Sequence, residues 1–314
     1  MTSVKDGFFS VDIAPATETD SVDARVAAAI RQMSAKLGSS DAAIDEEIDA
    51  EISLSKVRRT LDGLARVGIT VSGLRILDLG AGLGALSLEA SRRGAAVVAL
   101  EPGEGWREIA SERLKKEGKD AAVVAAGGER LPFGDGTFDG VISLQVLEHV
   151  RDPETTLREV FRVLKPGGFL WLTCENYLTF REPHYGIVWL PLLPKSIGAL
   201  YLRARGRSPE FLLTSITYTT QPWVRRILNG CGFTTMVDRK VRDAITTGTH
   251  TGWKGVLVRL STGVVSRERL ARLWAGAYYC SRMMTPMIGE LCWKPIAAGA
   301  GEGVQGERRT PAWQ

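Results

Sequence analysis

The sequence Arg75-Ile-Leu-Asp-Leu-Gly-Ala-Gly-Leu-Gly84 runs from an apolar stretch into a glycine-rich turn. A short apolar stretch before such a turn favours a buried strand, and the residues after it favour a helix. Gly80, Gly82 and Gly84 allow the backbone to turn sharply and to approach a ligand closely. The first amide groups of the helix would then point at that ligand. The stretch therefore predicts a site for a nucleoside-bearing cofactor.

Asp78 distinguishes between the cofactors that such a turn can hold. The pattern Gly80-x-Gly82-x-x-Ala85 also fits the fingerprint of dinucleotide sites, which permits Ala at its last position. A carboxylate at the end of a buried strand is costly unless a cation or a hydrogen-bond donor meets it. An aminoacyl ammonium would do so, whereas a pyrophosphate would be repelled. Asp78 therefore favours S-adenosylmethionine over a nicotinamide cofactor.

A second acidic residue, Glu101, ends the next apolar stretch. A carboxylate in this place can accept hydrogen bonds from both hydroxyls of a ribose. Asp78 and Glu101 are 23 residues apart, which is close to the spacing of one strand–helix–strand unit. Both carboxylates are therefore expected at the same cofactor.

Four landmarks in order resemble the class I S-adenosylmethionine-dependent methyltransferases, in the subgroup of ubiquinone-biosynthesis and small-molecule enzymes. They are residues 76–84, Glu101, Glu129-Arg-Leu-Pro-Phe-Gly-Asp-Gly-Thr-Phe-Asp139, and Val146-Leu-Glu-His-Val150 leading to Leu164-Lys-Pro-Gly-Gly168. The resemblance implies a doubly wound, Rossmann-like α/β fold with a seven-stranded, mostly parallel sheet. It also implies an N-terminal helical extension and an insertion after the fifth strand.

The resemblance assigns the residues that would hold the cofactor. The glycine turn would hold the methionine part, Glu101 the ribose, and the loop around Glu129 the adenine. Many relatives have an acidic residue two positions before Glu129, where this chain has Gly127, so backbone groups are expected to meet the adenine here. The predicted cofactor-binding residues are Asp78, Gly80, Ala81, Gly82, Gly84, Glu101, Pro102, Gly128, Glu129, Leu131, Leu144 and Gln145.

A base near the acceptor would assist methyl transfer to oxygen, and histidine suits neutral pH. The chain contains three histidines, His149, His184 and His250. We rank His184 ahead of His149, because in many relatives Glu148-His149 braces the following helix. Tyr185, beside His184, is expected to orient the acceptor.

A metal site is not predicted. A subset of relatives binds a divalent metal through the pattern Glu-x-x-Glu-His. This chain has Gln145 at the first position of that pattern, so the set of ligands is incomplete.

The sequence pattern divides the chain into three parts. Residues 1–72 are predicted to be a flexible N-terminus and a helical cap, and residues 263–314 a C-terminal helix over 266–291 with a disordered tail. Residues 73–262 would form the methyltransferase domain, with its acceptor-binding insertion at 175–220. Its strands are expected near 75–79, 96–101, 121–125, 138–144 and 168–174, with a final hairpin from 233–237 and 255–260.

The insertion at 175–220 is longer than an ordinary connection, so it is where an acceptor pocket is expected. Its aromatic residues and basic edge suit a small molecule or a glycan that carries a phosphate or carboxylate. The alternatives are a homodimer interface or a peripheral membrane contact through 187–207.

Composition agrees with an enzyme of this kind. A chain of 314 residues can bury a full α/β core. Its net charge of +4 is too small to indicate nucleic acid as a partner. The four cysteines are far apart in the sequence, without the close spacing of a disulfide framework or a zinc site. No signal peptide or membrane-spanning stretch is recognised, so a cytoplasmic location is expected.

These observations predict a methyltransferase that transfers the methyl group to an acceptor oxygen by in-line displacement. Transfer to carbon or nitrogen is the first alternative. An NAD-dependent oxidoreductase and a non-catalytic cofactor-binding protein are alternatives of other classes.

Overall fold

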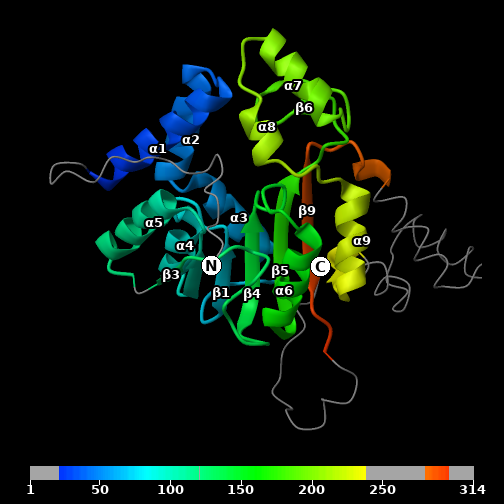
Figure 1. The fold of residues 1–314 in the computed structure, drawn as a ribbon. Helices are drawn as coiled ribbons and strands as arrows, with labels where there is room; N and C mark the ends of the chain where they lie inside the picture. Colours follow the sequence, from blue (N-terminus) through cyan, green and yellow to red (C-terminus); the bar gives the residue numbers. More distant parts are fainter. Residues whose placement is uncertain (1–20, 120, 238–279, 297–314) are drawn as a thin grey trace, which may run out of the picture.

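A seven-stranded sheet forms the centre of the molecule in this computed structural model, which describes residues 21–119, 121–237 and 280–296. The strands lie in the order β3-β2-β1-β4-β5-β9-β8, and β9 runs antiparallel to both of its neighbours (Figure 1). The predicted fold class is confirmed. The strands are β1 Arg75–Leu79, β2 Ala96–Leu100, β3 Ala122–Val124, β4 Phe138–Leu144, β5 Leu164–Glu175, β8 Thr234–Thr235 and β9 Met287–Trp293.

Helices cover both faces of the sheet, because successive strand residues point to opposite sides. Ile76 belongs to the core under one layer of helices, and its neighbour Leu77 belongs to the core on the other face. The first layer consists of α3 Ser55–Arg66, α4 Ala85–Arg92 and α5 Glu104–Lys116, and the second of α6 Pro153–Val163 and α9 Gln221–Cys231.

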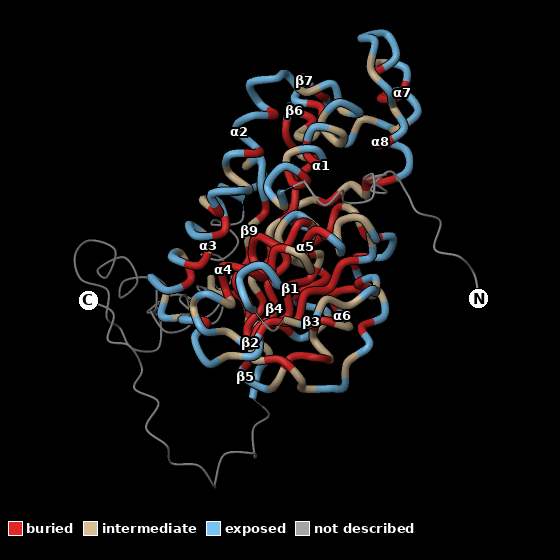
Figure 2. Tube along the Cα trace, turned by 90° about the vertical axis from the view of Figure 1, so that its left-hand side faces the viewer, coloured by how far each residue is buried: buried red, intermediate tan, exposed pale blue. Residues whose placement is uncertain are grey.

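Residues 176–220, here called the cap, form a small unit with its own core at the carboxyl end of β5. The core contains Tyr177, Tyr185, Trp189 and Phe211, and Figure 2 shows buried segments inside the unit. The elements of the cap are β6 Arg181–Glu182, β7 Ile187–Val188, α7 Lys195–Ala204 and α8 Glu210–Thr214.

Two N-terminal helices, α1 Val22–Leu37 and α2 Asp41–Ile52, join the cofactor side of the molecule to the cap. Their apolar residues pack with Leu83 of the glycine turn and with Ile109 of α5. The other end of α1 contacts the core of the cap, where Arg207 Nη1 donates to the Leu37 carbonyl oxygen at 3.0 Å. The N-terminal extension, which the sequence predicts to be helical, is thus helical over 22–37 and 41–52. It contacts both the glycine turn and the core of the cap.

The C-terminal part differs from the prediction. Residues 287–291, predicted to end a long helix, belong to β9, which pairs with β5 over seven residues. The edge of β5 has backbone N–H and C=O groups that need hydrogen-bond partners. The free energy gained by pairing them exceeds the helix preference that the apolar spacing indicates. The sheet therefore extends past residue 262, the predicted domain boundary. The predicted strand at 255–260, most of the predicted helix and both predicted disordered segments lie outside the described residues.

No helix within the described ranges has both the length and the apolar character needed to cross a membrane.

Candidate active site

The glycine turn is closely packed at its two ends and open in the middle. Gly80, Gly82 and Gly84 all have positive φ, a region that favours glycine. A Cβ on Gly80 would lie 2.4 Å from the side chain of Val146, and one on Gly84 would lie 2.9 Å from Ala110. A Cβ on Gly82 would meet no atom of the described residues within 4 Å. The middle of the turn therefore has space for a ligand.

Asp78 is buried at the end of β1, and its Oδ2 accepts a hydrogen bond from Ser87 Oγ at 2.6 Å. Burial raises the pKa of Asp78 to about 7; the Ser87 hydroxyl opposes the rise, and the Glu101 carboxylate adds to it. A cation placed nearby would offset both burial and the second carboxylate. This environment fits the ammonium of a methionine group, as the sequence predicts for Asp78.

Glu101 follows β2 and faces the middle of the turn. Its Oε2 accepts from the Gly82 amide at 2.9 Å, and its Oε1 accepts from the Gly103 amide at 2.8 Å. Burial raises the pKa of Glu101, and the two amides oppose this effect. A buried acceptor beside the open face of Gly82 fits the hydroxyls of a ribose.

Other predicted cofactor residues lie around these two carboxylates. The Ala81 amide donates to the Leu100 carbonyl oxygen at 2.9 Å, which ties the turn to the end of β2. Pro102 is exposed directly after Glu101, and Leu144 is half-buried at the end of β4.

The loop predicted to meet adenine has structural contacts of its own. A Cβ on Gly128 would lie 2.7 Å from Thr156 of α6, so glycine allows the loop to approach this helix. Glu129 Oε1 accepts from the Arg151 amide at 2.9 Å, and Leu131 is buried in the core. Contact of these residues with adenine stays a prediction.

Gln145 occupies a strained backbone position where β4 ends. Its φ is 55°, which is unusual for a residue other than glycine and is often found at functional sites. Its amide donates to the Thr173 carbonyl oxygen at 2.8 Å, and its Nε2 donates to Glu175 Oε1 at 2.7 Å. The side chain of Gln145 is therefore tied to the end of β5.

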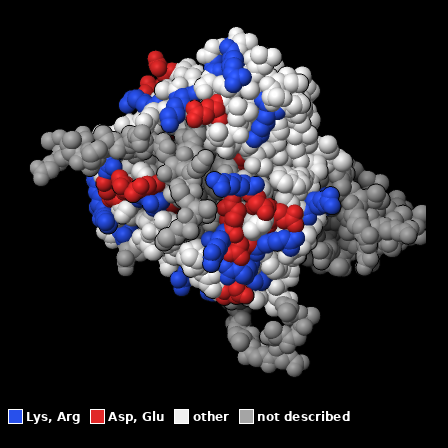
Figure 3. Space-filling view, viewed as in Figure 1, with Lys and Arg blue, Asp and Glu red and all other residues white. Residues whose placement is uncertain are grey.

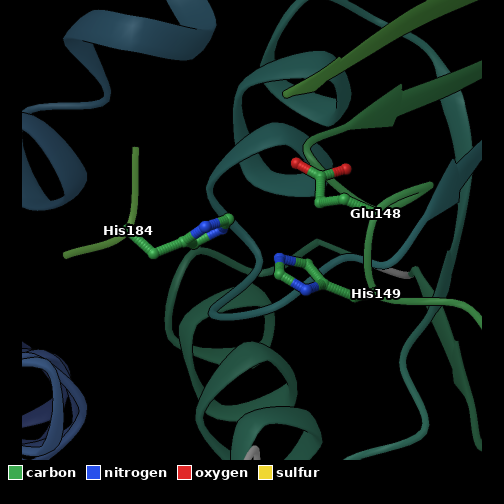
Figure 4. Close-up of side chains that lie close together, drawn as sticks. All are labelled: Glu148, His149 and His184. Carbon is green, nitrogen blue, oxygen red and sulfur yellow. The ribbon is translucent and has the colours of Figure 1, made fainter. Parts of the chain in front are cut away.

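The two histidines that the sequence offers as separate candidates lie together. Glu148 and His149 follow β4, whereas His184 comes from the cap and points toward them (Figure 4). The ring centroids of the two histidines are 5.2 Å apart. One nitrogen or oxygen atom from each of the three residues lies within 4.8 Å of the others. We call these three residues the histidine cluster.

Each histidine is oriented through its Nδ1 atom. In His184 this atom lies 3.3 Å from Glu182 Oε1 and 3.2 Å from the Tyr177 hydroxyl. In His149 it lies 2.9 Å from the Ser215 carbonyl oxygen. A carboxylate or carbonyl oxygen accepts a hydrogen bond, so these contacts favour a proton on Nδ1 and a basic Nε2 in both rings.

The surroundings separate the pKa values of the cluster. Burial lowers the pKa of His149 to about 3, and the nearby His184 adds to this effect. Burial also acts to lower the pKa of His184, but Glu182, Glu148 and Glu175 outweigh it and raise the pKa above its ordinary 6.5. Burial raises the pKa of Glu148 to about 7. Of the two histidines, we therefore expect only His184 to change its charge close to neutral pH.

Tyr177, rather than Tyr185, is the tyrosine at this cluster. The Tyr185 hydroxyl donates to the Ser208 carbonyl oxygen at 2.8 Å, within the cap, whereas the Tyr177 hydroxyl reaches His184. Neither Tyr177 nor Glu182, which both contact His184, was predicted from the sequence as a site residue. Glu182 lies two residues before His184 in the sequence Arg181-Glu-Pro-His184, and this spacing is the signal that could have identified it.

The histidine cluster also has the composition of a metal site. One carboxylate and two imidazoles form a donor set that several divalent metals accept. No metal was predicted because Gln145 replaces the first acidic ligand of the motif. In the structure the Gln145 side chain donates a hydrogen bond to Glu175. His184, which the motif does not include, completes the set from the cap. The absence of a metal stays a prediction.

Comparison with known proteins identifies the central part of the chain. Residues 77–172 match the family model described as "Methyltransferase domain". A "Ubiquinone biosynthesis O-methyltransferase" from Rhizobium rhizogenes is 38% identical over 106 residues, which cover 34% of this chain and 43% of the relative. A "Demethylmenaquinone methyltransferase" from Clavibacter sepedonicus is 38% identical over 159 residues, which cover 49% of this chain and 60% of the relative.

The chain therefore spans less than half the length of the ubiquinone-biosynthesis relative that it matches. Among solved structures, phosphoethanolamine N-methyltransferase 2 from Haemonchus contortus aligns with a TM-score of 0.46 and 20% identity, over 76% of this chain and 52% of that chain. The domain match favours the methyltransferase prediction over an oxidoreductase. Residues 77–172 thus match a methyltransferase domain, the type of domain that the sequence predicts to use S-adenosylmethionine.

Proposed function

We propose that the chain transfers a methyl group from S-adenosylmethionine to a hydroxyl oxygen of a small acceptor. The acceptor would carry its hydroxyl on an aromatic or sugar ring and would lie between the cap and the carboxyl end of the sheet. The observation that carries this proposal is the meeting of His184 with the residues that follow β4, at the edge of the sheet where the cofactor turn also lies. Val146 contacts the turn at Gly80, and Glu148 is only two residues further along.

The cofactor supplies a methyl group that is already activated as a sulfonium, so orientation provides most of the catalysis. In this chain Asp78 would hold the ammonium and Glu101 the ribose, which fixes the direction of the methyl group. Both carboxylates are buried and have raised pKa values, so a cationic, hydroxyl-bearing ligand would relieve an existing cost.

His184 would accept the acceptor proton at Nε2 as the new carbon–oxygen bond forms. Glu182 and Tyr177 hold the opposite side of its ring, and the carboxylate would stabilise the imidazolium that results. His149 is a poor candidate by comparison, because a group with a pKa of about 3 binds a proton weakly. The aromatic ring of Phe211, 5.1 Å from that of His184, offers an apolar wall.

The relatives' names support a hydroxylated ring as the acceptor, since one is an O-methyltransferase of ubiquinone biosynthesis. The basic, aromatic cap is the feature that supports a sugar or glycan acceptor.

The test is methyl transfer from a labelled donor to a panel of phenols, catechols, hydroxyquinones and glycosides. We expect labelled product with the methyl group on oxygen, and S-adenosylhomocysteine in equal amount. Label on nitrogen or carbon would contradict the assignment of the atom. Cofactor binding without transfer to any member would remove this acceptor class.

A further inference from the structure

The outer surface of the cap exposes an unusual number of large apolar side chains. Of the twelve such side chains exposed among the described residues, six lie within residues 180–200. Val188 is 75% exposed and Leu200 is 67% exposed. Monomeric proteins rarely expose large contiguous apolar patches, so six exposed apolar side chains within 21 residues need an explanation. We call this set the apolar surface of the cap; it consists of Phe180, Val188, Leu190, Leu192, Ile197 and Leu200.

Helix α7 explains why this surface cannot be buried within the chain's own cap. Its inner face is already used, because Gly198 lies against the Trp189 ring and Leu202 is fully buried. A Cβ on Gly198 would lie 2.5 Å from that ring, so the helix is as close to the cap core as it can be. Ile197 and Leu200, one turn apart, therefore point outward. The helix is apolar on both sides.

Basic residues outnumber acidic ones in the cap. Residues 176–220 contain five Lys or Arg and two Asp or Glu, a net charge of +3, whereas the whole chain has +4. One of the two acids, Glu182, is buried. Arg203 and Arg205 are exposed at the end of α7. Figure 3 shows the cap, at the top, as mostly white with separate blue groups.

We propose that the cap docks on the surface of an anionic lipid bilayer, with Ile197 and Leu200 in the interface and Arg203 and Arg205 at the head groups. Apolar side chains flanked by basic ones are typical of helices that lie in a membrane interface. A second copy of this chain is a poorer occupant, because a dimer through this surface would bring two caps of net charge +3 together. The proposal goes beyond the methyltransferase activity and does not depend on it.

Sedimentation of the full chain with vesicles tests this docking without cofactor or acceptor. We expect binding to vesicles of phosphatidylcholine with phosphatidylglycerol, weaker binding to phosphatidylcholine alone, and a loss of binding as salt increases. The double variant Ile197→Ser with Leu200→Ser should bind anionic vesicles about tenfold more weakly or worse. The control Ile296→Ser changes a side chain that is also 67% exposed but lies after β9, so it should bind like the wild type.

The charges are tested by Arg203→Gln with Arg205→Gln. Each lost arginine should weaken binding to anionic vesicles about fivefold. Arg59→Gln with Arg66→Gln removes two exposed arginines of α3 and should leave the binding unchanged. Equal melting temperatures would show that all variants are folded.

Several results would overturn the proposal. They are absence of binding by the wild type, equal loss in the control variants, and binding that ignores lipid charge. A dimer in sedimentation equilibrium that Ile197→Ser with Leu200→Ser dissociates, without any lipid binding, would assign the surface to a second copy. Because no acceptor is present, failure here would leave the proposed methyl transfer untouched.

Discussion

The two halves of the proposed active site, here called the cofactor side and the acceptor side, are built in different ways. On the cofactor side, the turn after β1 and the carboxylate after β2 lie within residues 78–101 and contact each other directly, because the Gly82 amide donates to the Glu101 carboxylate. On the acceptor side, Glu148 follows β4, while His184 belongs to a separate unit inserted after β5. The difference shows that one site is a local motif and the other is an assembly of distant segments.

The electrostatics of the two sides differ as well. Asp78 and Glu101 are both acids whose pKa values burial raises, so a cationic ligand would relieve the cost of ionising them. The acceptor side contains its own basic group, because nearby carboxylates raise the pKa of His184. We therefore expect substitutions to separate binding of the cofactor from turnover.

The largest expected effect is on turnover. His184→Ala should lower kcat about 10²- to 10⁴-fold and leave the affinity for S-adenosylmethionine unchanged, because the residue acts only on the acceptor proton. Steady-state kinetics and calorimetry measure the two quantities. His149→Ala is the matched control and should mainly lower the melting temperature. Full turnover in His184→Ala would show that the two sides are not divided in this way.

The pH dependence sharpens the same assignment. A base must be neutral to accept a proton, so kcat should rise with pH through a pKa above 6.5 and then level off. If His149 were the base, its pKa of about 3 would leave kcat constant over the whole neutral range. The pH profile of the wild type, measured between the acid limit of stability and mildly alkaline pH, separates these outcomes.

The next effect is on cofactor binding. Asp78→Ala should weaken S-adenosylmethionine binding by about 1.5–3 kcal/mol, the value of a hydrogen bond to a charged group, with kcat nearly unchanged at saturation. Calorimetry measures this loss. Ser87→Ala, which removes only the neutral partner of Asp78, should cost less. Equal losses in the two variants would mean that Asp78 acts through α4 and not on the ligand.

A smaller effect concerns stability. The folded state holds the proton of Glu148 up to a pKa of about 7, above the ordinary 4.5, so its burial costs stability as pH rises through that interval. Glu148→Gln removes this cost and should raise the free energy of unfolding by about 2 kcal/mol at pH 8, with little gain at pH 4.5. Denaturant titration at both pH values measures it. An identical change at the two pH values would contradict a buried, titrating carboxyl.

The smallest expected effect is that of a chelator. His184 can balance the carboxylates around it by taking a proton, so we expect EDTA to leave kcat unchanged. Turnover measured before and after chelation checks this. Loss of activity that added Mg²⁺ or Zn²⁺ restores would assign Glu148, His149 and His184 to a metal.

Much of the fold could be predicted because its signals are local. Strand β1 was predicted at the residues where it lies, since an apolar run followed by glycines leaves few alternatives. Residues 287–291 of strand β9 were predicted as the end of a helix. Its pairing with β5 satisfies an edge more than a hundred residues away in the sequence, and apolar spacing carries no information about that edge.

The sequence by itself predicted the glycine turn with Asp78 and Glu101 and the methyltransferase domain around them, because these residues interact within one strand–helix–strand unit. It also named His149 and His184, since the chain has few histidines. Only the tertiary structure decided that these two rings lie 5.2 Å apart, that Tyr177 and Glu182 hold one of them, and that their pKa values diverge. The physical reason is that burial and distance govern pKa values, and both depend on how the cap folds back onto the end of the sheet.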